Sequence, residues 1–108
     1  MNKIKVIIKR PDEEFGHMTW IGDTLQNLQK TVEGPIETLS IGGSTVLIMN
    51  EEGKLRRDVE PNFFIREHGY KDIVCGTVIV AGNDGSEEFV DIPISLDAWK
   101  EILMKWGN

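Results

Sequence analysis

A block of charged and polar side chains, Asn50–Arg57, follows directly after the apolar run Val46–Met49. A strand that ends in such a turn delivers several hydrogen-bonding groups to one small region of surface. Its cationic side chains suit an anionic ligand, while its amide and carboxylates suit a ribose or a base. The predicted ligand-binding residues are the polar groups of this block, one nearby amide and one aromatic ring: Asn50, Glu51, Lys54, Arg56, Arg57, Asn62 and Trp20.

The same composition is also typical of a solvated turn that binds nothing, in which Asn50 and Gly53 only shape the backbone. Trp20 likewise has two roles open to it, because an indole can stack on a base or pack beneath a helix. We expect it to pack, since large aromatic side chains are mostly buried. Trp99 and Trp106 belong to an apolar helical stripe and are predicted to lie in the core.

Three other groups of residues are weaker candidates. Asp12–Glu14 with His17 contains metal-ligand types, but no second ligand cluster follows, so a solvated loop is favoured and no metal is predicted. Cys75 with His17 or His68 has the types of a nucleophile and a base. Cys75 lies inside the most apolar run of the chain, however, where a free cysteine is usually an inert core residue.

Glu37 and Glu51 are candidates for an acid and base pair, although no spacing singles them out among the many glutamates. The chain has no P-loop, no dinucleotide fingerprint and no CxxC, HExxH or GxSxG motif. We therefore predict no cofactor, and an enzyme is the least favoured class.

The charge balance restricts the partners. The net charge is −6, and phosphate backbones require clustered Lys and Arg, so direct binding to nucleic-acid backbones is not expected. The acid excess is sharpest from Asp84 to Glu101, where Lys100 is the only cation. Such a stretch suits a basic protein partner, approached by electrostatic steering.

The 108 residues fit one compact domain, 1–108. Cys75 is the only cysteine, which fits a reducing cytosol. The chain opens directly into a strand-like pattern without a signal peptide, and no apolar run approaches the roughly 20 residues that span a bilayer. A cytoplasmic protein without membrane contact is expected.

Alternating or continuous apolar residues predict strands at 4–8, 18–21, 36–41, 45–49, 73–81 and 88–92. The run 73–81 is apolar on both faces, which predicts a central strand. A first helix is predicted over 24–32, with Asp23 as N-cap and Gly34 as left-handed C-cap, and a second from Ser95 to Gly107. Residues 51–66 are expected to form a loop that Phe63–Ile65 anchors.

The predicted fold class is therefore α+β: one compact domain, with an antiparallel or mixed sheet of about five strands and two helices packed on it.

Four segments resemble a family of small proteins without assigned function from Gram-positive bacteria and their phages and mobile elements: Leu28–Glu37, Asn50–Leu55, Pro61–Asn62 and Gly76–Thr77. The resemblance spans about Lys3 to Phe89, and its most specific part is Asn-Glu-Glu-Gly-Lys at 50–54. Such proteins usually have Gly-Gly or Gly-aromatic where this chain has Gly34 before a proline. The family brings no established activity, and the resemblance implies a compact intracellular accessory protein.

Three functional hypotheses follow. The first is a non-enzymatic binding protein that sequesters a small anionic, nucleotide-like ligand in counter-defence, with the ligand enclosed at a homo-oligomer interface. The second is an acidic module that docks on a basic partner, and the third is an enzyme of unrecognised type. A concave pocket lined by the 50–57 block favours the first, and a convex acidic face favours the second.

Overall fold

The computed structural model of the chain describes residues 2–67 and 69–108. In these ranges the helices and strands are β1 (Lys3–Lys9), β2 (His17–Gly22), α1 (Leu25–Val32), β3 (Ile36–Gly42), β4 (Thr45–Asn50), β5 (Pro61–Glu67), β6 (Tyr70–Cys75), β7 (Val78–Asn83), β8 (Phe89–Val90) and α2 (Leu96–Lys105). The predicted α+β class is confirmed. The strands form a six-stranded sheet and a separate two-stranded hairpin, rather than the single sheet of about five strands that the sequence predicts.

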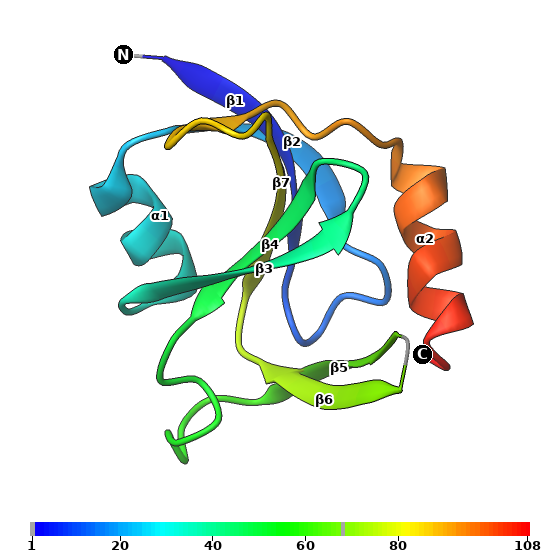
Figure 1. The fold of residues 1–108 in the computed structure, drawn as a ribbon. Coiled ribbons are helices and arrows are strands. Elements are labelled where there is room, and N and C mark those ends of the chain that lie inside the picture. Colours follow the sequence, from blue (N-terminus) through cyan, green and yellow to red (C-terminus); the bar gives the residue numbers. More distant parts are fainter. Residues whose placement is uncertain (1, 68) are drawn as a thin grey trace.

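The main sheet has the order β2-β1-β7-β4-β3, and β8 pairs with the end of β7. All of its pairings are antiparallel. Figure 1 shows α1 and α2 on opposite sides of this sheet, with the β5–β6 hairpin close to the C-terminal end. β2 and β3 are the two edge strands of this order. Residues of β3 and of the β5–β6 hairpin line a common pocket.

Each face of the main sheet carries its own apolar core. On one face, Leu28 and Val32 of α1 pack in a cluster with residues of β1, β4 and β7. On the other face, α2 and the hairpin cover the sheet. Consecutive residues of β7 contribute to opposite clusters, and both Val78 and Ile79 are fully buried. This confirms the predicted central strand, in which each buried side chain contributes about 1.5–3 kcal/mol.

Helix α2 is fixed by its two tryptophans, as predicted. The rings of Phe63, Trp99 and Trp106 form a three-membered cluster with centroid separations of 5.7, 6.1 and 6.0 Å. Both indole N–H groups have partners, since Trp99 donates to the Phe15 carbonyl and Trp106 to a Glu67 carboxylate oxygen, each at 2.9 Å. The amphipathic helix is therefore held by apolar burial and by directed hydrogen bonds.

The prediction of one continuous strand over 73–81 is wrong. The run is divided between β6 in the hairpin and β7 in the main sheet. Gly76 separates the two with a φ of +83°, which a residue with a side chain rarely adopts. The apolar pattern continues across the break because both strands face the same core, so periodicity alone does not mark it.

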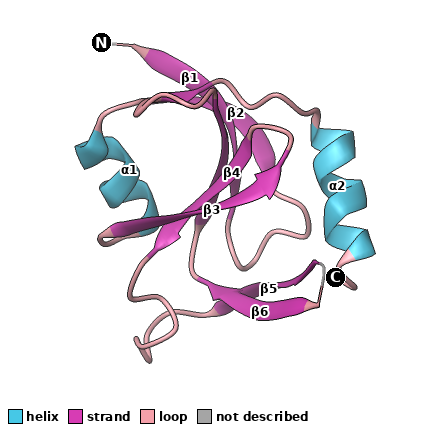
Figure 2. Ribbon diagram, in the orientation of Figure 1, coloured by secondary structure: helices cyan, strands magenta, loops and turns pink. Residues whose placement is uncertain are grey.

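Two other predictions need correction. The N-cap of α1 is Thr24, whose hydroxyl accepts from the Asn27 N–H, and not Asp23. Ser95 caps α2 as predicted. The segment predicted as loop up to Arg66 contains β5, because Phe63 and Ile65 alternate into the core as a strand requires. Figure 2 shows the remaining loop between β4 and β5 without regular structure.

Candidate functional site

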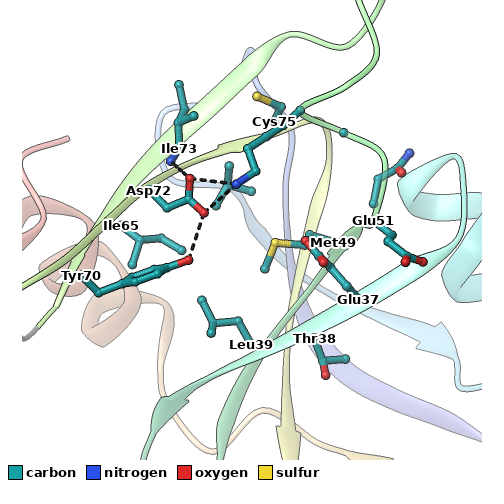
Figure 3. A pocket seen from close by; sticks show the side chains of 14 residues that line it. Glu37, Thr38, Leu39, Met49, Glu51, Ile65, Tyr70, Asp72, Ile73 and Cys75 are labelled. Carbon is teal, nitrogen blue, oxygen red and sulfur yellow. Dashed lines mark hydrogen bonds and ion pairs between the residues drawn. The ribbon is translucent and has the colours of Figure 1, made fainter.

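A pocket opens between edge strand β3, the loop after β4 and the inner face of the β5–β6 hairpin (Figure 3). Its cavity volume is about 140 Å³. The lining includes apolar residues of the core and polar residues of the rim, among them Leu39, Ile65, Glu37, Lys54, Tyr70 and Asp72. Part of the predicted block, from Asn50 to Lys54, thus forms one wall of a concave site.

Lys54, Asp72 and Tyr70 form a hydrogen-bonded cluster in this pocket. The Lys54 ammonium donates to Oδ1 and Oδ2 of Asp72 at 2.9 and 2.8 Å. The Tyr70 hydroxyl donates to Oδ2 at 2.9 Å, and the backbone N–H of Ile73 donates to Oδ1 at 2.8 Å. Because each oxygen of Asp72 accepts two hydrogen bonds, its carboxylate is held in a defined position on β6.

The contacts fix the charge states of the cluster. The hydrogen bond from Lys54 lowers the pKa of Asp72, and the same bond raises the pKa of Lys54. The hydrogen bond to Asp72 raises the pKa of Tyr70. At neutral pH the groups are therefore a carboxylate, an ammonium and a phenol. None of these pKa values moves towards neutrality, as a general acid or base at pH 7 requires.

Two more carboxylates line the pocket, Glu37 from β3 and Glu51 from the loop after β4. Figure 3 shows Glu37 on the β3 side and Asp72 on the hairpin side of the cavity. With Asp72, the lining holds three carboxylates against the one ammonium of Lys54, a formal excess of two negative charges. The two glutamates that the sequence offered as an acid and base pair thus share one pocket.

Asn50 is buried and tied into the fold. Its Nδ2 donates to the carbonyl oxygens of Val32 and Glu33 at 3.1 and 3.2 Å, and its Oδ1 accepts from the Glu52 N–H at 2.7 Å. These contacts join the C-terminal end of α1 to the loop after β4. A ligand that took the Nδ2 hydrogens would therefore have to displace the end of α1.

Two glycines make room for this arrangement. A Cβ on Gly34 would lie 2.6 Å from Nδ2 of Asn50, and a Cβ on Gly53 would lie 2.8 Å from the Cys75 carbonyl oxygen. Gly34, predicted as the left-handed cap of the first helix, is instead a packing glycine, and Glu33 is the left-handed residue with a φ of 64°. Gly53 allows the loop to approach β6 closely, which positions the neighbouring Lys54 beside Asp72.

Asn62 lies outside the pocket and joins three segments. Its Nδ2 donates to the carbonyl oxygens of Lys9 and Gly76, both at 2.8 Å, and its Oδ1 accepts from the Lys9 ammonium at 2.5 Å. Lys9 is buried, and it also donates to the Glu13 carbonyl at 2.7 Å. Burial lowers the pKa of Lys9. Asn62 therefore connects β1, β5 and the turn between β6 and β7.

Three more of the predicted binding residues lie outside the pocket lining. Arg56 forms a two-point ion pair with Asp58 at 3.1 and 2.6 Å and donates to the Glu33 carbonyl at 3.0 Å. Arg57 is exposed on the loop. Trp20 is 56% exposed on β2, the sheet edge opposite to β3, so its predicted packing beneath a helix is wrong. The structure does not bring Trp20 to the block.

The weaker candidate sites have ordinary surroundings. His17, the first residue of β2, has its Nδ1 2.7 Å from a carboxylate oxygen of Glu13, and both side chains are partly exposed. Cys75 is half-buried at the edge of the pocket rather than in the core, and burial raises the pKa of its thiol. Figure 3 shows its sulfur pointing away from the centre of the pocket. His68, its other suggested partner, lies outside the described residues.

Among residues 2–67 and 69–108, no group of three or more His, Cys, Asp and Glu side chains is placed to hold a metal ion. In the same part of the chain, no helix combines the length and apolar character needed to cross a membrane.

A family model matches nearly the whole chain. Residues 4–103 match the family model of a domain of unknown function, DUF3846. The chain belongs to this family. No curated protein and no solved structure matches it. Membership of DUF3846 confirms the predicted relation to proteins without assigned function, while an origin in Gram-positive bacteria, phages or mobile elements stays a prediction.

In this DUF3846 domain, sequence reasoning missed Tyr70 and Asp72, which hold the centre of the pocket. A usable signal was present, because both residues share strand parity with Val74, which faces the core. A carboxylate at a core-facing strand position requires hydrogen-bonding partners. The sequence pattern does not reveal the break at Gly76, so it gives no reason to place a separate hairpin beside β3.

Proposed function

We propose that this DUF3846 domain is a non-enzymatic binding protein whose pocket between β3 and the hairpin captures a positively charged group of a ligand. A cavity of about 140 Å³ is smaller than the several hundred Å³ that enclose a whole drug-sized ligand. It is sized for one compact group with a short apolar stem, such as an alkyl amine or a guanidine. The apolar floor of Leu39, Met49 and Ile65 suits such a stem.

The observation that carries the proposal is the charge of the lining. Three residues with carboxylates and one lysine line the pocket, and the Lys54 ammonium is already bound by both oxygens of Asp72. A second cation would meet the carboxylate of Glu37, which lies close enough to Lys54 to raise its pKa, with Glu51 also in the lining. Cations near uncompensated carboxylates in a partly enclosed site gain more than they would at an open surface, because the effective dielectric constant is lower.

The anionic, nucleotide-like ligand predicted from the sequence would meet the carboxylates of Asp72 and Glu37 beside the ammonium of Lys54. Arg56 gives little support to such a ligand, since Asp58 already pairs with it. Counter-defence, a phage origin and a cytoplasmic location rest on the resemblance and the composition. They extend the proposal to a bacterial or phage accessory protein, but they do not decide whether its ligand is positively or negatively charged.

The acidic interaction module receives no specific support. Its carboxylates are divided among the exposed connection from β7 to β8, Asp91 just after β8, and the separate helix α2. Asp91 accepts a hydrogen bond from the backbone N–H of Lys5 at 2.9 Å, so it is partly engaged within the fold.

A ligand screen tests the proposal. Thermal-shift measurements and calorimetry at low ionic strength would compare alkyl amines and guanidines with linear and cyclic nucleotides. We expect cations to raise Tm and nucleotides to leave it unchanged. Glu37→Gln should weaken cation binding, while Glu101→Gln on the exposed part of α2 serves as the charge-matched control. Nucleotide binding that Lys54→Ala abolishes would overturn the proposed ligand charge.

A further inference from the structure

The backbone of β3 offers hydrogen-bonding groups to the pocket side. In an antiparallel pair, residues whose N–H and C=O face the partner strand alternate with residues whose groups face away. The N–H of Glu51 donates to the Pro35 carbonyl at 2.8 Å. Because bonded residues alternate along a strand, the N–H and C=O of Glu37 and Leu39 also face β4. Thr38 lies between them, so its N–H and C=O point away from β4. Thr38 also lines the pocket.

The hairpin shows how this molecule closes an edge elsewhere. The Asn108 side chain accepts from the Phe64 N–H and donates to the Phe64 carbonyl, both at 2.9 Å, as a neighbouring strand would. On β6, the N–H of Ile73 is bonded by Asp72. β3 has no second strand partner within the described residues. The edge of β3 therefore faces a cavity and, in the described part of the chain, has no further strand beside it.

The space beside β3 is long enough for more than one side chain. A second cavity, with a volume of about 390 Å³, continues from the first and shares Leu39, Ile65 and Tyr70 with it. Ile41 contributes to its lining, which is mainly apolar. We treat the two adjacent cavities as one groove along β3, in which Glu37 lines the first cavity, and Ile41 together with Glu67 lines the second.

We infer that this groove binds an extended peptide segment of a partner protein, which adds a strand to the free edge of β3. A Lys or Arg of the peptide enters the acidic cavity, and an apolar side chain two positions away enters the second cavity. The inference rests on the proposed function, since the acidic cavity is the same site. In this inference, the cationic group that the pocket binds is a Lys or Arg side chain of a polypeptide and not a free amine.

The spacing supports this occupant. Side chains on one face of a strand recur every two residues, about 6.6–6.8 Å apart, and Glu37 and Leu39 of β3, which both line the first cavity, have this period. Ile41 lies at the irregularity between Ser40 and Gly42 and lines the second cavity. Added strands gain affinity from main-chain hydrogen bonds and specificity from pockets for alternate side chains. A second copy of β3 is a poor occupant, because Ile36–Gly42 contains Glu37 but no Lys or Arg.

Fluorescence polarisation with two labelled peptides tests the inference: Thr-Thr-Lys-Thr-Leu-Thr-Thr and its reversed core, Thr-Thr-Leu-Thr-Lys-Thr-Thr. We expect one of them to bind, and replacement of its Lys by Glu should weaken binding at least about tenfold. Thr38→Pro removes the outward N–H and should weaken binding similarly, while Thr38→Val keeps that N–H and should bind normally. Proline is tolerated on edge strands, and Tm verifies that both variants fold.

Backbone N-methylation of the bound peptide gives a second readout that is specific for a strand. Methyl groups on one set of alternate residues should abolish binding, and methyl groups on the other set should not. Peptide binding that survives Thr38→Pro and shows no alternation would overturn strand addition while leaving the cation pocket intact.

The remaining outcomes separate the two proposals. Binding of free amines without binding of either peptide would overturn the inference alone. Failure of amines and peptides together would overturn the proposed function as well. A dimer in sedimentation velocity that Thr38→Pro dissociates, without peptide binding, would identify a second copy as the occupant and contradict the inference.

Discussion

Three residues that the sequence predicts as ligand-binding, Asn50, Asn62 and Lys54, lie in two different kinds of polar cluster. Asn50 and Asn62 bond mainly to backbone groups, and the side chain of Asn50 is 4% exposed. Lys54 and Asp72 bond to each other, with side chains 51% and 29% exposed. The difference teaches that the type of partner, and not the type of residue, separates a structural polar group from one available to a ligand.

The energetic reason is the cost of breaking each interaction. A buried carbonyl or N–H that loses its partner costs about 1–3 kcal/mol, so amides that bond to the backbone resist displacement. An exposed ion pair contributes only about 0.2–1 kcal/mol. Lys54 and Asp72 can therefore exchange one partner for a ligand at little cost, whereas Asn50 and Asn62 cannot.

Removal of Asn62 is the strongest test of this contrast. Asn62→Ala leaves the carbonyls of Lys9 and Gly76 and the buried Lys9 ammonium each short of one partner. We expect a loss of about 2–4 kcal/mol in the free energy of unfolding, measured by urea denaturation. Asn83→Ala, which removes an amide that serves only an exposed turn, is the control and should cost less than about 1 kcal/mol. Equal losses for the two variants would break the contrast.

Asn50→Ala should have the second-largest effect. The variant frees the Val32 and Glu33 carbonyls at the end of α1 and the Glu52 N–H, which predicts a loss of about 2–3 kcal/mol. Asn50→Asp keeps the acceptor but sets a carboxylate against two carbonyl oxygens, so it should be no more stable than the alanine variant. A stable Asn50→Ala protein that had lost ligand affinity would instead restore Asn50 as a binding residue.

The fold was largely readable because its main signals are local. Alternation located most strands, and the stripe of α2 identified Trp99 and Trp106 as core residues. The break at Gly76 was missed since both flanking strands face one core and keep the same apolar pattern. The sequence predicts Asp23 as N-cap, whereas the N-cap is Thr24; both residue types cap well, and only the backbone geometry decides between them.

The candidate site was readable only in part, because it depends on contacts distant in sequence. The block supplied Lys54, but its partner Asp72 is 18 positions further along the chain, beyond a loop and a strand that the pattern did not place. Glu37 comes from an edge strand whose facing element was unknown. Sequence types thus identified one wall of the pocket, while the tertiary arrangement supplied the other.

Lys54→Met sharpens the contrast from the pocket side. Because the pair is exposed, we expect a loss below about 1 kcal/mol in the free energy of unfolding. Removing the ammonium also removes the cation that competes for Asp72, so the affinity for an alkyl amine should rise up to about tenfold in calorimetry. Weaker amine binding in this variant would show that Asp72 depends on Lys54 for its position and would contradict the proposed competition between the two cations.

The smallest expected effect is the pH dependence of the same pair. Lys54 lowers the pKa of Asp72, so the stability contributed by the carboxylate is present above its ordinary pKa of 3.8 and is lost as pH falls through the lowered value. Asp72 raises the pKa of Lys54, so the contribution of the ammonium is present below 10.5 and is lost as pH rises through the raised value. The difference in Tm between the unaltered protein and Asp72→Asn should therefore be constant from about pH 5 to pH 9 and should shrink on both sides. A difference that grew below pH 4 would mean that folding raises the pKa of Asp72, which would contradict the stabilisation of its carboxylate by Lys54.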